Sequence, residues 1–347
     1  METTPGSDRR EGTATGGEAG PDGGAGSAPR RVALFGATGT IGRATAAALQ
    51  RQGHAVTCFV RPGRPTAAAL PPDLALCPVD PADGPALAAA LGAAGCKAVI
   101  SCMASRTGAP RDAWAVDYLA HHNLLAAAGE AGVQQFVLLS AICVQKPLLA
   151  FQQAKLAFER ELVASGLRYS IVRPTAFFKS LSGQIDRVRR GQPFLIFGDG
   201  RLTACTPISD EDLAAYLVGC LDDPARWNRV LPIGGPGPAI TPREQGEALF
   251  ALLGRPPRFR SVPVGLLDAI ITVLATLGRV VPALAAKAEL ARIGRYYATE
   301  SMLVLDPRTG RYDAAATPAT GTATLVDFYR AVMAGEAAPE RGDHAVF

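Results

Sequence analysis

The segment "LLAFQQAKLAFE", residues 148–159, places Phe151 four positions before Lys155. On a helix, two residues with this spacing lie one turn apart on the same face, so both side chains would reach one site. The lysine ammonium can hold a ligand oxygen, but a phenylalanine has no proton to donate. The pair predicts chemistry in which a cation positions the ligand and no phenol acts as an acid.

A second motif with chemical meaning lies in "RRVALFGATGTIGRATAAALQRQG", where glycines separate a predicted buried strand, 32–35, from a predicted helix, 40–52. The first glycine permits a tight turn, the second lets the backbone approach a pyrophosphate, and the third lets the helix pack closely on the strand. The helix amino terminus then offers free N–H groups to phosphates. This strand–loop–helix context predicts a dinucleotide site. The residues expected to bind the cofactor are Gly36, Thr38, Gly39, Thr40, Ile41 and Gly42.

The end of the next predicted strand, "HAVTCFVR", distinguishes the two nicotinamide cofactors. An NAD site places Asp or Glu there, to accept hydrogen bonds from the ribose hydroxyls. This chain instead has Arg61 and Arg64, with no carboxylate between them. Guanidinium groups suit a 2′-phosphate and match a bare ribose poorly. The predicted cofactor is therefore NADPH.

Strand and helix signals continue to alternate after these motifs. Apolar strands are expected in "LALCPVD", "KAVISCMAS", "QQFVLLSAI" and "RYSIVRPTAFF", with helices between them that include a long one over 111–131. Such repeated units predict an α/β fold of the Rossmann type, with a doubly wound parallel sheet. Ligands bind beyond the carboxyl ends of the strands in these sheets. Asp80 and Ser140, each at such an end, are expected to contact the cofactor.

Changes in composition divide the chain into four parts. Residues 1–29 are rich in Gly, Ala, Thr and Pro, which predicts a disordered extension. An NADP-binding domain is expected over 30–235, with part of the substrate cleft beginning near residue 176. A smaller substrate-binding lobe is expected over 236–335, and 336–347 form a tail.

Composition also argues against several classes of protein. The net charge of +4 is spread along the chain without a basic and aromatic cluster, so no nucleic-acid partner is expected. The seven cysteines contain no CxxC pair, so no metal site is expected. The most apolar stretch, "VPVGLLDAIITVLATLGRVVPALAA", is interrupted by Asp268 and Arg279 and falls short of the ~20 apolar residues that span a bilayer. It suits either a helix packed on the body or an amphipathic helix at a membrane surface.

The pattern around Lys155 departs from the short-chain dehydrogenase/reductase superfamily, in which Tyr-x-x-x-Lys serves carbonyl chemistry. There the tyrosine protonates the oxygen and the lysine holds the nicotinamide ribose. The segments "FVLLSAICVQKPLLAFQQAKLAFE", "YSIVRPTAFFKSLSGQ", "FGDGRLTACTPIS", "VLPIGGPG" and "IGRYYATESMLVLDP" together resemble an atypical branch of that superfamily, the NADPH-dependent 8-vinyl reductases of chlorophyll and bacteriochlorophyll synthesis. The resemblance runs from about residue 31 to near the carboxyl terminus. It includes Phe151.

The resemblance implies reduction of the 8-vinyl group of divinyl chlorophyllide a or divinyl protochlorophyllide a to ethyl. It implies that Lys155 is the catalytic residue and holds the nicotinamide ribose. It also implies a cytoplasmic protein that is free to lie at the periphery of photosynthetic membranes. An open alternative is a non-enzymatic regulator or pigment-complex assembly factor that binds NADPH without consuming it. Residues expected to contact the tetrapyrrole are Phe151, Phe177, Phe178, Lys179 and Tyr296, with His121 and His122 as further candidates for its central magnesium.

Overall fold

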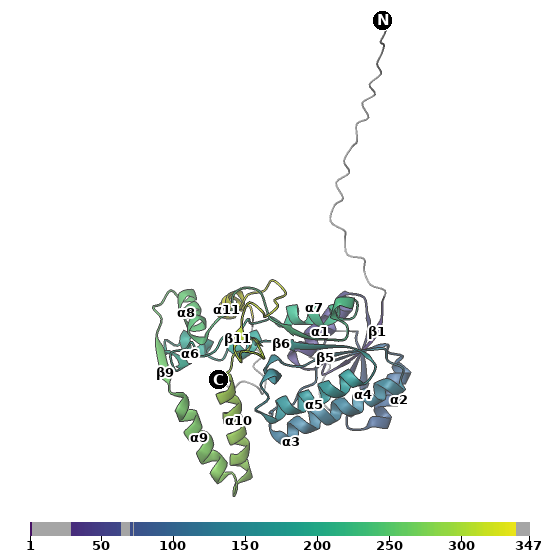
Figure 1. The fold of residues 1–347 in the computed structure, drawn as a ribbon, viewed down its shortest axis with the longest axis horizontal. Helices are drawn as coiled ribbons and strands as arrows, with labels where there is room; N and C mark the ends of the chain where they lie inside the picture. The colour runs from purple at the N-terminus through teal and green to yellow at the C-terminus, as the bar shows by residue number, and fades with distance from the viewer. Residues whose placement is uncertain (2–28, 64–69, 72, 338–347) are drawn as a thin grey trace.

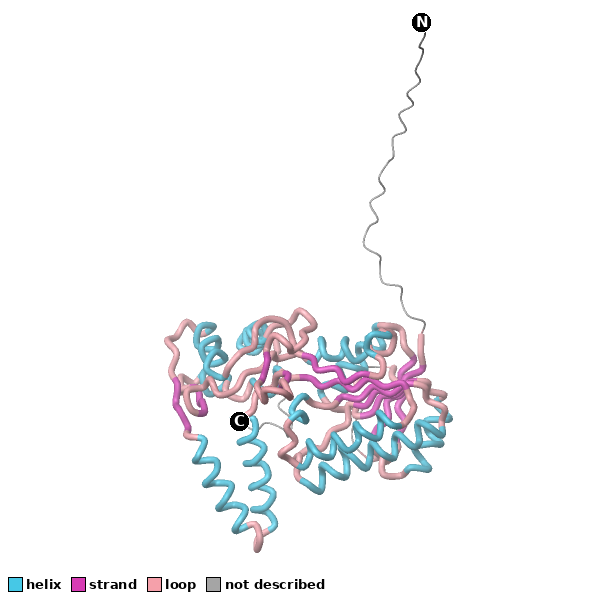
Figure 2. The backbone as a smooth tube through the Cα atoms, viewed as in Figure 1, coloured by secondary structure: helices cyan, strands magenta, loops and turns pink. Residues whose placement is uncertain are grey.

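A parallel sheet, magenta in Figure 2, forms the centre of the nucleotide-binding half of the molecule. It has seven strands in the order β3-β2-β1-β4-β5-β6-β8. The computed structural model describes residues 1, 29–63, 70–71 and 73–337. The predicted doubly wound α/β fold is confirmed, and the "VLPIGG" segment supplies a further strand at one edge. The strands are β1 (Arg31–Phe35), β2 (Ala55–Val60), β3 (Ala75–Pro78), β4 (Ala98–Ser101), β5 (Gln135–Leu139), β6 (Arg168–Pro174) and β8 (Arg229–Ile233).

Helices cover both faces of the sheet, as a parallel sheet requires (Figure 1). One face packs on α1 (Thr40–Arg51) and α7 (Asp210–Gly219), and Val32 and Leu34 of β1 point into that core. Ala33 and Phe35 of β1 point into the other core. Its helices are α2 (Gly84–Ala94), α4 (His121–Glu130) and α5 (Ala150–Ala164). Because every residue from 32 to 35 is buried, the strand reads as one apolar run in the sequence.

The long helix expected over 111–131 is present but changes its winding. It begins as α3 (Pro110–Ala113), continues as the π-helical segment η2 (Trp114–Ala120), and ends as α4. A π-helical turn holds an extra residue, so the side chains beyond it are rotated relative to an uninterrupted α-helix. This segment carries Asp117, whose contacts are described below.

The second half of the chain contributes a lobe beside the carboxyl ends of the strands (Figure 1). Its core contains Phe178, Phe194, Phe250 and Tyr329. These residues come from both sides of the expected boundary at 235/236, and that boundary stays a prediction. The remaining elements are η3 (Ile142–Gln145), η4 (Phe178–Leu181), α6 (Ile185–Arg189), β7 (Phe194–Phe197), η5 (Pro224–Arg226), α8 (Pro242–Leu252), β9 (Phe259–Val262), β10 (Val304–Leu305), β11 (Tyr312–Asp313) and α11 (Leu325–Ala334).

Two helices of this half form a hairpin that projects from the body (Figures 1 and 2). Helix α9 (Val264–Leu277) leads outward from β9, and α10 (Pro282–Thr299) returns toward the end of the sheet. The two helices pack along each other. The root of α10 reaches the region of Phe151, as described below.

Candidate cofactor site and active site

The glycine-rich loop packs so closely at Gly36 and Gly42 that neither can be replaced by a larger residue without a shift of the backbone. Gly36 has φ +73°, and a Cβ on it would lie 2.6 Å from the backbone carbonyl carbon of Cys102, just beyond β4. A Cβ on Gly42 would lie 2.0 Å from the carbonyl oxygen of Gly36. The turn after β1 is therefore held between the end of β4 and the first turn of α1. This agrees with the tight turn and the close helix packing expected for Gly36 and Gly42.

The amino terminus of α1 suits a phosphate group. Its N-cap is Gly39, no side chain caps it, and no acidic residue lies in its first turn. Thr38 and Gly39 are exposed, whereas Ile41 is buried and fixes the helix on the sheet. Nη1 of Arg43 donates a hydrogen bond to the carbonyl oxygen of Thr38 at 2.9 Å, which brings a cation to the same loop. Uncapped N–H groups, a positive dipole end and a nearby arginine together fit a pyrophosphate.

Two of the residues expected near the adenosine half, Arg61 and Asp80, lie at the surface. Arg61 follows β2 directly and is exposed, with no side-chain partner in the described part of the chain. Arg64 lies outside the described residues. Asp80 is exposed just beyond β3, and its Oδ1 accepts a hydrogen bond from the backbone N–H of Ala82 at 3.0 Å, so it caps its own turn. Contact of these residues with the cofactor stays a prediction.

Ser140 takes part in a buried polar network. Its Oγ donates a hydrogen bond to Oε1 of Glu159 at 2.5 Å, and Nε of Arg173 donates to the same oxygen at 3.1 Å. Glu159 also forms an ion pair with Arg173, which joins α5 to β6. The Ser140 hydroxyl therefore has a structural partner, and its expected contact with the cofactor stays a prediction.

Lys155 forms a buried ion pair that the sequence did not reveal. Its Nζ lies 2.9 Å from Oδ1 of Asp117, and the exposed fractions of the two side chains are 11% and 0%. The backbone N–H of Ser105 donates to the same Oδ1 at 3.3 Å. Oδ2 of Asp117 is buried and has no hydrogen-bond partner among the described residues. A buried carboxylate oxygen without a partner is costly, so Oδ2 suits a hydrogen bond from a ligand hydroxyl or a bound water.

His121, the first residue of α4, lies in the interior of the protein. His121 is 1% exposed, and its Nδ1 lies 2.9 Å from the carbonyl oxygen of Val116. That oxygen only accepts, so Nδ1 carries the proton and Nε2 accepts from the Ser101 hydroxyl at 2.9 Å. Burial, with the nearby Lys155 charge as a smaller cause, lowers the pKa of His121 to about 4. Both ring nitrogens have partners within the protein, so the expectation of a magnesium ligand at His121 was wrong.

Phe151 lies where the loop after β4, helix α5 and helix α10 meet. A Cβ on Gly108, which has φ +68°, would lie 3.4 Å from Cδ1 of Phe151 and 3.0 Å from Cδ1 of Ile293. Phe151 also packs with an apolar cluster that includes Cys143 and Tyr296. The position one turn from Lys155 thus has apolar surroundings.

Tyr296 anchors α10 on this region. It is 4% exposed, and its hydroxyl donates to the carbonyl oxygen of Cys143 at 2.8 Å. Burial raises the pKa of Tyr296, which keeps the phenol protonated. These contacts give Tyr296 a structural role in holding α10 in place, and its contact with substrate stays a prediction. The hydroxyl of the next residue, Tyr297, lies 4.0 Å from Sγ of Cys143, and this tyrosine is 37% exposed.

The two phenylalanines after β6 have different surroundings. Phe177 is partly buried beside the sheet core and pairs with Ile208 through an isolated bridge. Phe178 is 5% exposed and packs in the core of the lobe, where its ring centroid lies 5.5 Å from that of Phe328. Packing therefore accounts for Phe178, and its expected contact with a macrocycle stays a prediction.

Lys179 lies among charged groups that border the phosphate loop. Burial lowers its pKa; Asp210 opposes this effect, and the positive charge of Arg43 adds to it. Burial also raises the pKa of Asp210 to about 6. Oδ1 of Asp210 is buried with no hydrogen-bond partner among the residues described. Lys179 therefore lies close to the first helix of the cofactor site, and its expected contact with substrate stays a prediction.

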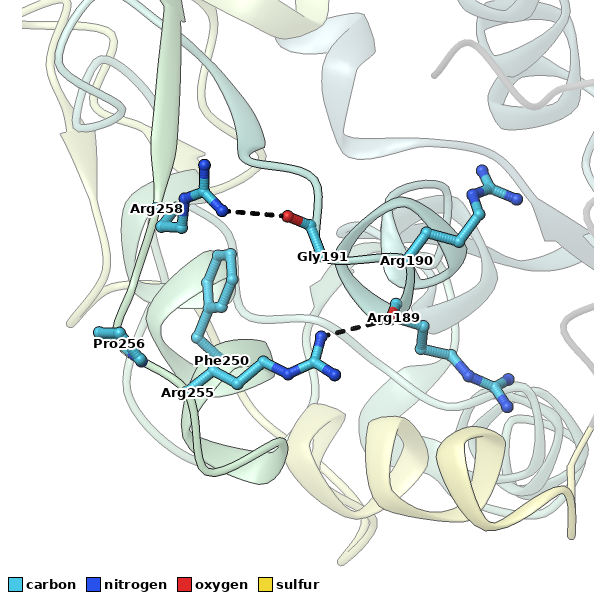
Figure 3. A pocket seen from close by; sticks show the side chains of 7 residues that line it. All are labelled: Arg189, Arg190, Gly191, Phe250, Arg255, Pro256 and Arg258. Atoms are coloured by element: carbon cyan, nitrogen blue, oxygen red, sulfur yellow. Dashed lines mark hydrogen bonds between the residues drawn. The ribbon is translucent and has the colours of Figure 1, made fainter.

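A recess of about 500 Å³ lies in the lobe between α6 and the segment before β9 (Figure 3). The guanidinium groups of Arg255 and Arg258 donate to the carbonyl oxygens of Arg189 and Gly191, each at 3.3 Å (Figure 3). These arginines thus hold the turn after α6. None of the expected site residues lines this recess. Within the described ranges, no three His, Cys, Asp or Glu residues are grouped so that they could hold a metal.

Comparison with known proteins agrees with this geometry. The NAD(P)H-binding family model matches residues 36–224. An NADPH-dependent quinone oxidoreductase from Escherichia coli has the same fold, with a TM-score of 0.64 and 18% identity over 87% of this chain and 99% of that chain. The divinyl chlorophyllide a 8-vinyl-reductases of Oryza sativa subsp. indica and Zea mays are 50% and 51% identical, each over 91% of this chain and 82% of the relative. The chain belongs to the family of divinyl chlorophyllide a 8-vinyl-reductases.

Proposed function

We propose that this protein reduces the 8-vinyl group of divinyl chlorophyllide a, or of divinyl protochlorophyllide a, to an ethyl group with NADPH. The observation that carries the proposal is the 50% identity to a divinyl chlorophyllide a 8-vinyl-reductase over 91% of the chain. The presence of Lys155 together with Phe151 supports it. The pair keeps a cation for a ribose and lacks the acid that a carbonyl reductase needs.

The reaction adds two electrons and two hydrogen atoms to one carbon–carbon double bond. Bound NADPH supplies the hydride. The terminal carbon of the vinyl group accepts it, and the conjugated macrocycle delocalises the negative charge. The inner carbon then takes a proton from water or from a more distant donor. No alkoxide forms, so no phenol has to neutralise an oxygen. An apolar side chain at position 151 is compatible with this reaction.

The proposal assigns the residues of the site as follows. The loop from Gly36 to Gly42 holds the pyrophosphate, and Arg61 with Arg64 binds the 2′-phosphate. Lys155 holds the nicotinamide ribose, and Asp117 fixes the direction of its ammonium group. The macrocycle then lies beside Phe151, near the root of α10. The exposed arginine after β2 and the absence of a carboxylate there support NADPH over NADH.

The test is incubation of the purified protein with each divinyl pigment and either NADPH or NADH, followed by chromatographic separation of divinyl and monovinyl products. Monovinyl product is expected with NADPH and markedly less with NADH. Absence of product with both cofactors and both pigments would overturn the proposal. Binding of NADPH without consumption, together with a stable protein partner, would instead favour the regulator or assembly factor.

A further inference from the structure

Helix α9 has an apolar stripe that the described part of the chain leaves uncovered. None of its residues is buried. Four large apolar side chains recur at helical spacing and are 40% to 57% exposed: Leu266, Ile270, Val273 and Leu277. Val280 and Val281, in the turn that follows, extend the stripe and are 84% and 45% exposed. Contiguous apolar surface of this kind marks a site of interaction with a protein or a membrane.

The hairpin that carries the stripe is a packed element. A Cβ on Gly278 would lie 2.8 Å from Cα of Ala285, so the two helices touch at the turn. Asp268, the sole acidic residue in α9, forms an ion pair with Arg295 of α10. The Tyr296 hydroxyl fixes the root of α10 on the segment after β5. The stripe is thus presented on a closed hairpin that projects from the body (Figure 1).

The charges at the outer end of the hairpin have one sign. We define the hairpin tip as residues 277–287. It contains Arg279 and Lys287, both exposed, and no acidic residue. Neither cation has an ion-pair partner among the residues that the structure describes. Glu289, the next acidic residue along α10, lies 2.9 Å from Nη1 of Arg292 and is thereby paired. The hairpin tip therefore combines apolar side chains with unpaired positive charge.

We propose that the hairpin tip and the exposed stripe of α9 dock the protein on an anionic lipid surface. Apolar side chains that enter the boundary of the acyl chains, with cations at the level of the headgroups, are typical of interfacial helices. At 14 residues, α9 is about 21 Å long, whereas the hydrocarbon core of a bilayer is about 30 Å thick. No helix in the described ranges meets the length and hydropathy needed for a span. The hairpin would therefore lie in the surface layer.

Charge favours lipid over a second copy of the chain as the occupant. A symmetric dimer that sets the two hairpin tips side by side would bring their cations together, and like charges in an interface oppose association. Anionic headgroups complement the same cations. Docking would bring the root of α10, and with it the surroundings of Phe151, close to the membrane surface.

The test is flotation of the full chain with vesicles of phosphatidylcholine alone or mixed with phosphatidylglycerol. It measures no turnover, so its result is independent of the proposed reaction. The wild type is expected to float with the mixed vesicles. Val273→Asp/Leu277→Asp, at positions already half exposed, should remain with the unbound protein. Leu148→Asp/Val163→Asp, at side chains that are 62% and 48% exposed, adds the same two charges elsewhere; it is the matched control and should float like the wild type.

Two further double variants distinguish docking on anionic lipid from non-specific hydrophobic adsorption. Arg279→Gln/Lys287→Gln should weaken binding to the mixed vesicles about 30-fold, because each basic residue near an anionic surface raises the binding constant about fivefold. Lys97→Gln/Arg229→Gln removes two exposed charges elsewhere and should leave binding unchanged. Thermal melting confirms that each variant is folded.

Three results would overturn the proposal. The first is a wild-type protein that does not float with mixed vesicles. The second is an aspartate double variant that floats as well as the wild type. The third is a dimer, seen by light scattering without vesicles, that Val273→Asp/Leu277→Asp converts to a monomer, because it would assign the stripe to a second copy.

Discussion

Nζ of Lys155 lies 2.9 Å from Oδ1 of Asp117, within a pair of side chains that are almost completely enclosed. The lysine stands on α5 and the aspartate on η2, so the ion pair joins two helices beside the same face of the sheet. The aspartate compensates the ammonium charge and fixes its direction. Its second oxygen, Oδ2, has no hydrogen-bond partner among the described residues and so suits a ligand hydroxyl or water. Lys155 is thus held in place before any ligand arrives.

The first prediction concerns this ion pair. Lys155→Met leaves a buried carboxylate without its cation, which should lower the free energy of unfolding by about 3–5 kcal/mol. Asp117→Asn/Lys155→Met removes both charges and should recover much of that loss. Urea titrations of the wild type, Lys155→Met, Asp117→Asn and the double variant give the coupling free energy. NADPH binding should be weak in both variants that lack Lys155, because the ribose contact is absent whether or not stability returns. Tight NADPH binding by the double variant would refute this role of Lys155.

The second prediction concerns the close approach of α1 to the turn after β1. Gly42→Ala places a methyl group 2.0 Å from the carbonyl oxygen of Gly36, so the helix must move away from the loop. We expect loss of measurable NADPH binding together with a lower melting temperature. Gly92→Ala is the matched control, since no described atom outside the backbone of its own helix, α2, lies within 4 Å of its Cβ position. The control should be neutral or stabilising by up to about 1 kcal/mol.

The third prediction concerns cofactor choice. Arg61→Glu replaces an exposed cation at the end of β2 with the type of residue that binds a ribose diol. The KM for NADPH should rise about 10- to 100-fold, as expected when a charged hydrogen bond is lost, while the KM for NADH stays constant or falls. Arg229→Glu changes the net charge equally and should affect neither value. An equal change in the KM for NADPH and for NADH in Arg61→Glu would mean that this arginine does not bind the 2′-phosphate.

The fourth prediction concerns the phenylalanine one turn before Lys155. Phe151→Tyr restores the hydroxyl that carbonyl reductases use, but the proposed reaction has no oxygen to protonate. Turnover of divinyl pigment should not increase, and its pH profile should gain no new ionisation. Phe151→Leu serves as a control for changes in packing against Gly108 and Ile293. A large gain in kcat with tyrosine would show that an acid at this position does assist the reaction.

The fifth prediction concerns the pH dependence of stability. The pKa of His121 is lowered from 6.5 to about 4, mainly by burial, so the unfolded chain binds a proton at higher pH than the folded one. The contribution to stability is complete above pH 6.5 and is lost as the pH falls toward 4, by roughly 3 kcal/mol in total. His121→Gln should flatten the stability curve in this window. Asp210, whose pKa is raised to about 6, acts with the opposite sign and affects both proteins alike, so the difference between the two curves isolates His121. If the free energies of unfolding of the wild type and His121→Gln changed in parallel between pH 6.5 and pH 4, the prediction would be contradicted.

The sequence by itself determined the features that depend on neighbours along the chain. Apolar runs such as 32–35 predicted the parallel sheet, because strands covered on both faces must be apolar at every position. Glycine spacing from 36 to 42 predicted the phosphate loop, since the turn requires a positive φ at one glycine and close helix packing at another. The spacing of Phe151 and Lys155 placed both on one face of α5.

Only the tertiary structure decided which groups from distant segments meet. Asp117 reaches Lys155 from a π-helical segment, which no residue pattern in the sequence predicts. The tertiary structure buried His121 and Phe178, and it placed Ile293 of α10 against the Gly108 and Phe151 region. It also left one side of α9 uncovered, although the residues of that helix are apolar nearly all round. Local sequence sets which elements form, but contacts between separate elements depend on how their surfaces pack, and that is a property of the whole fold.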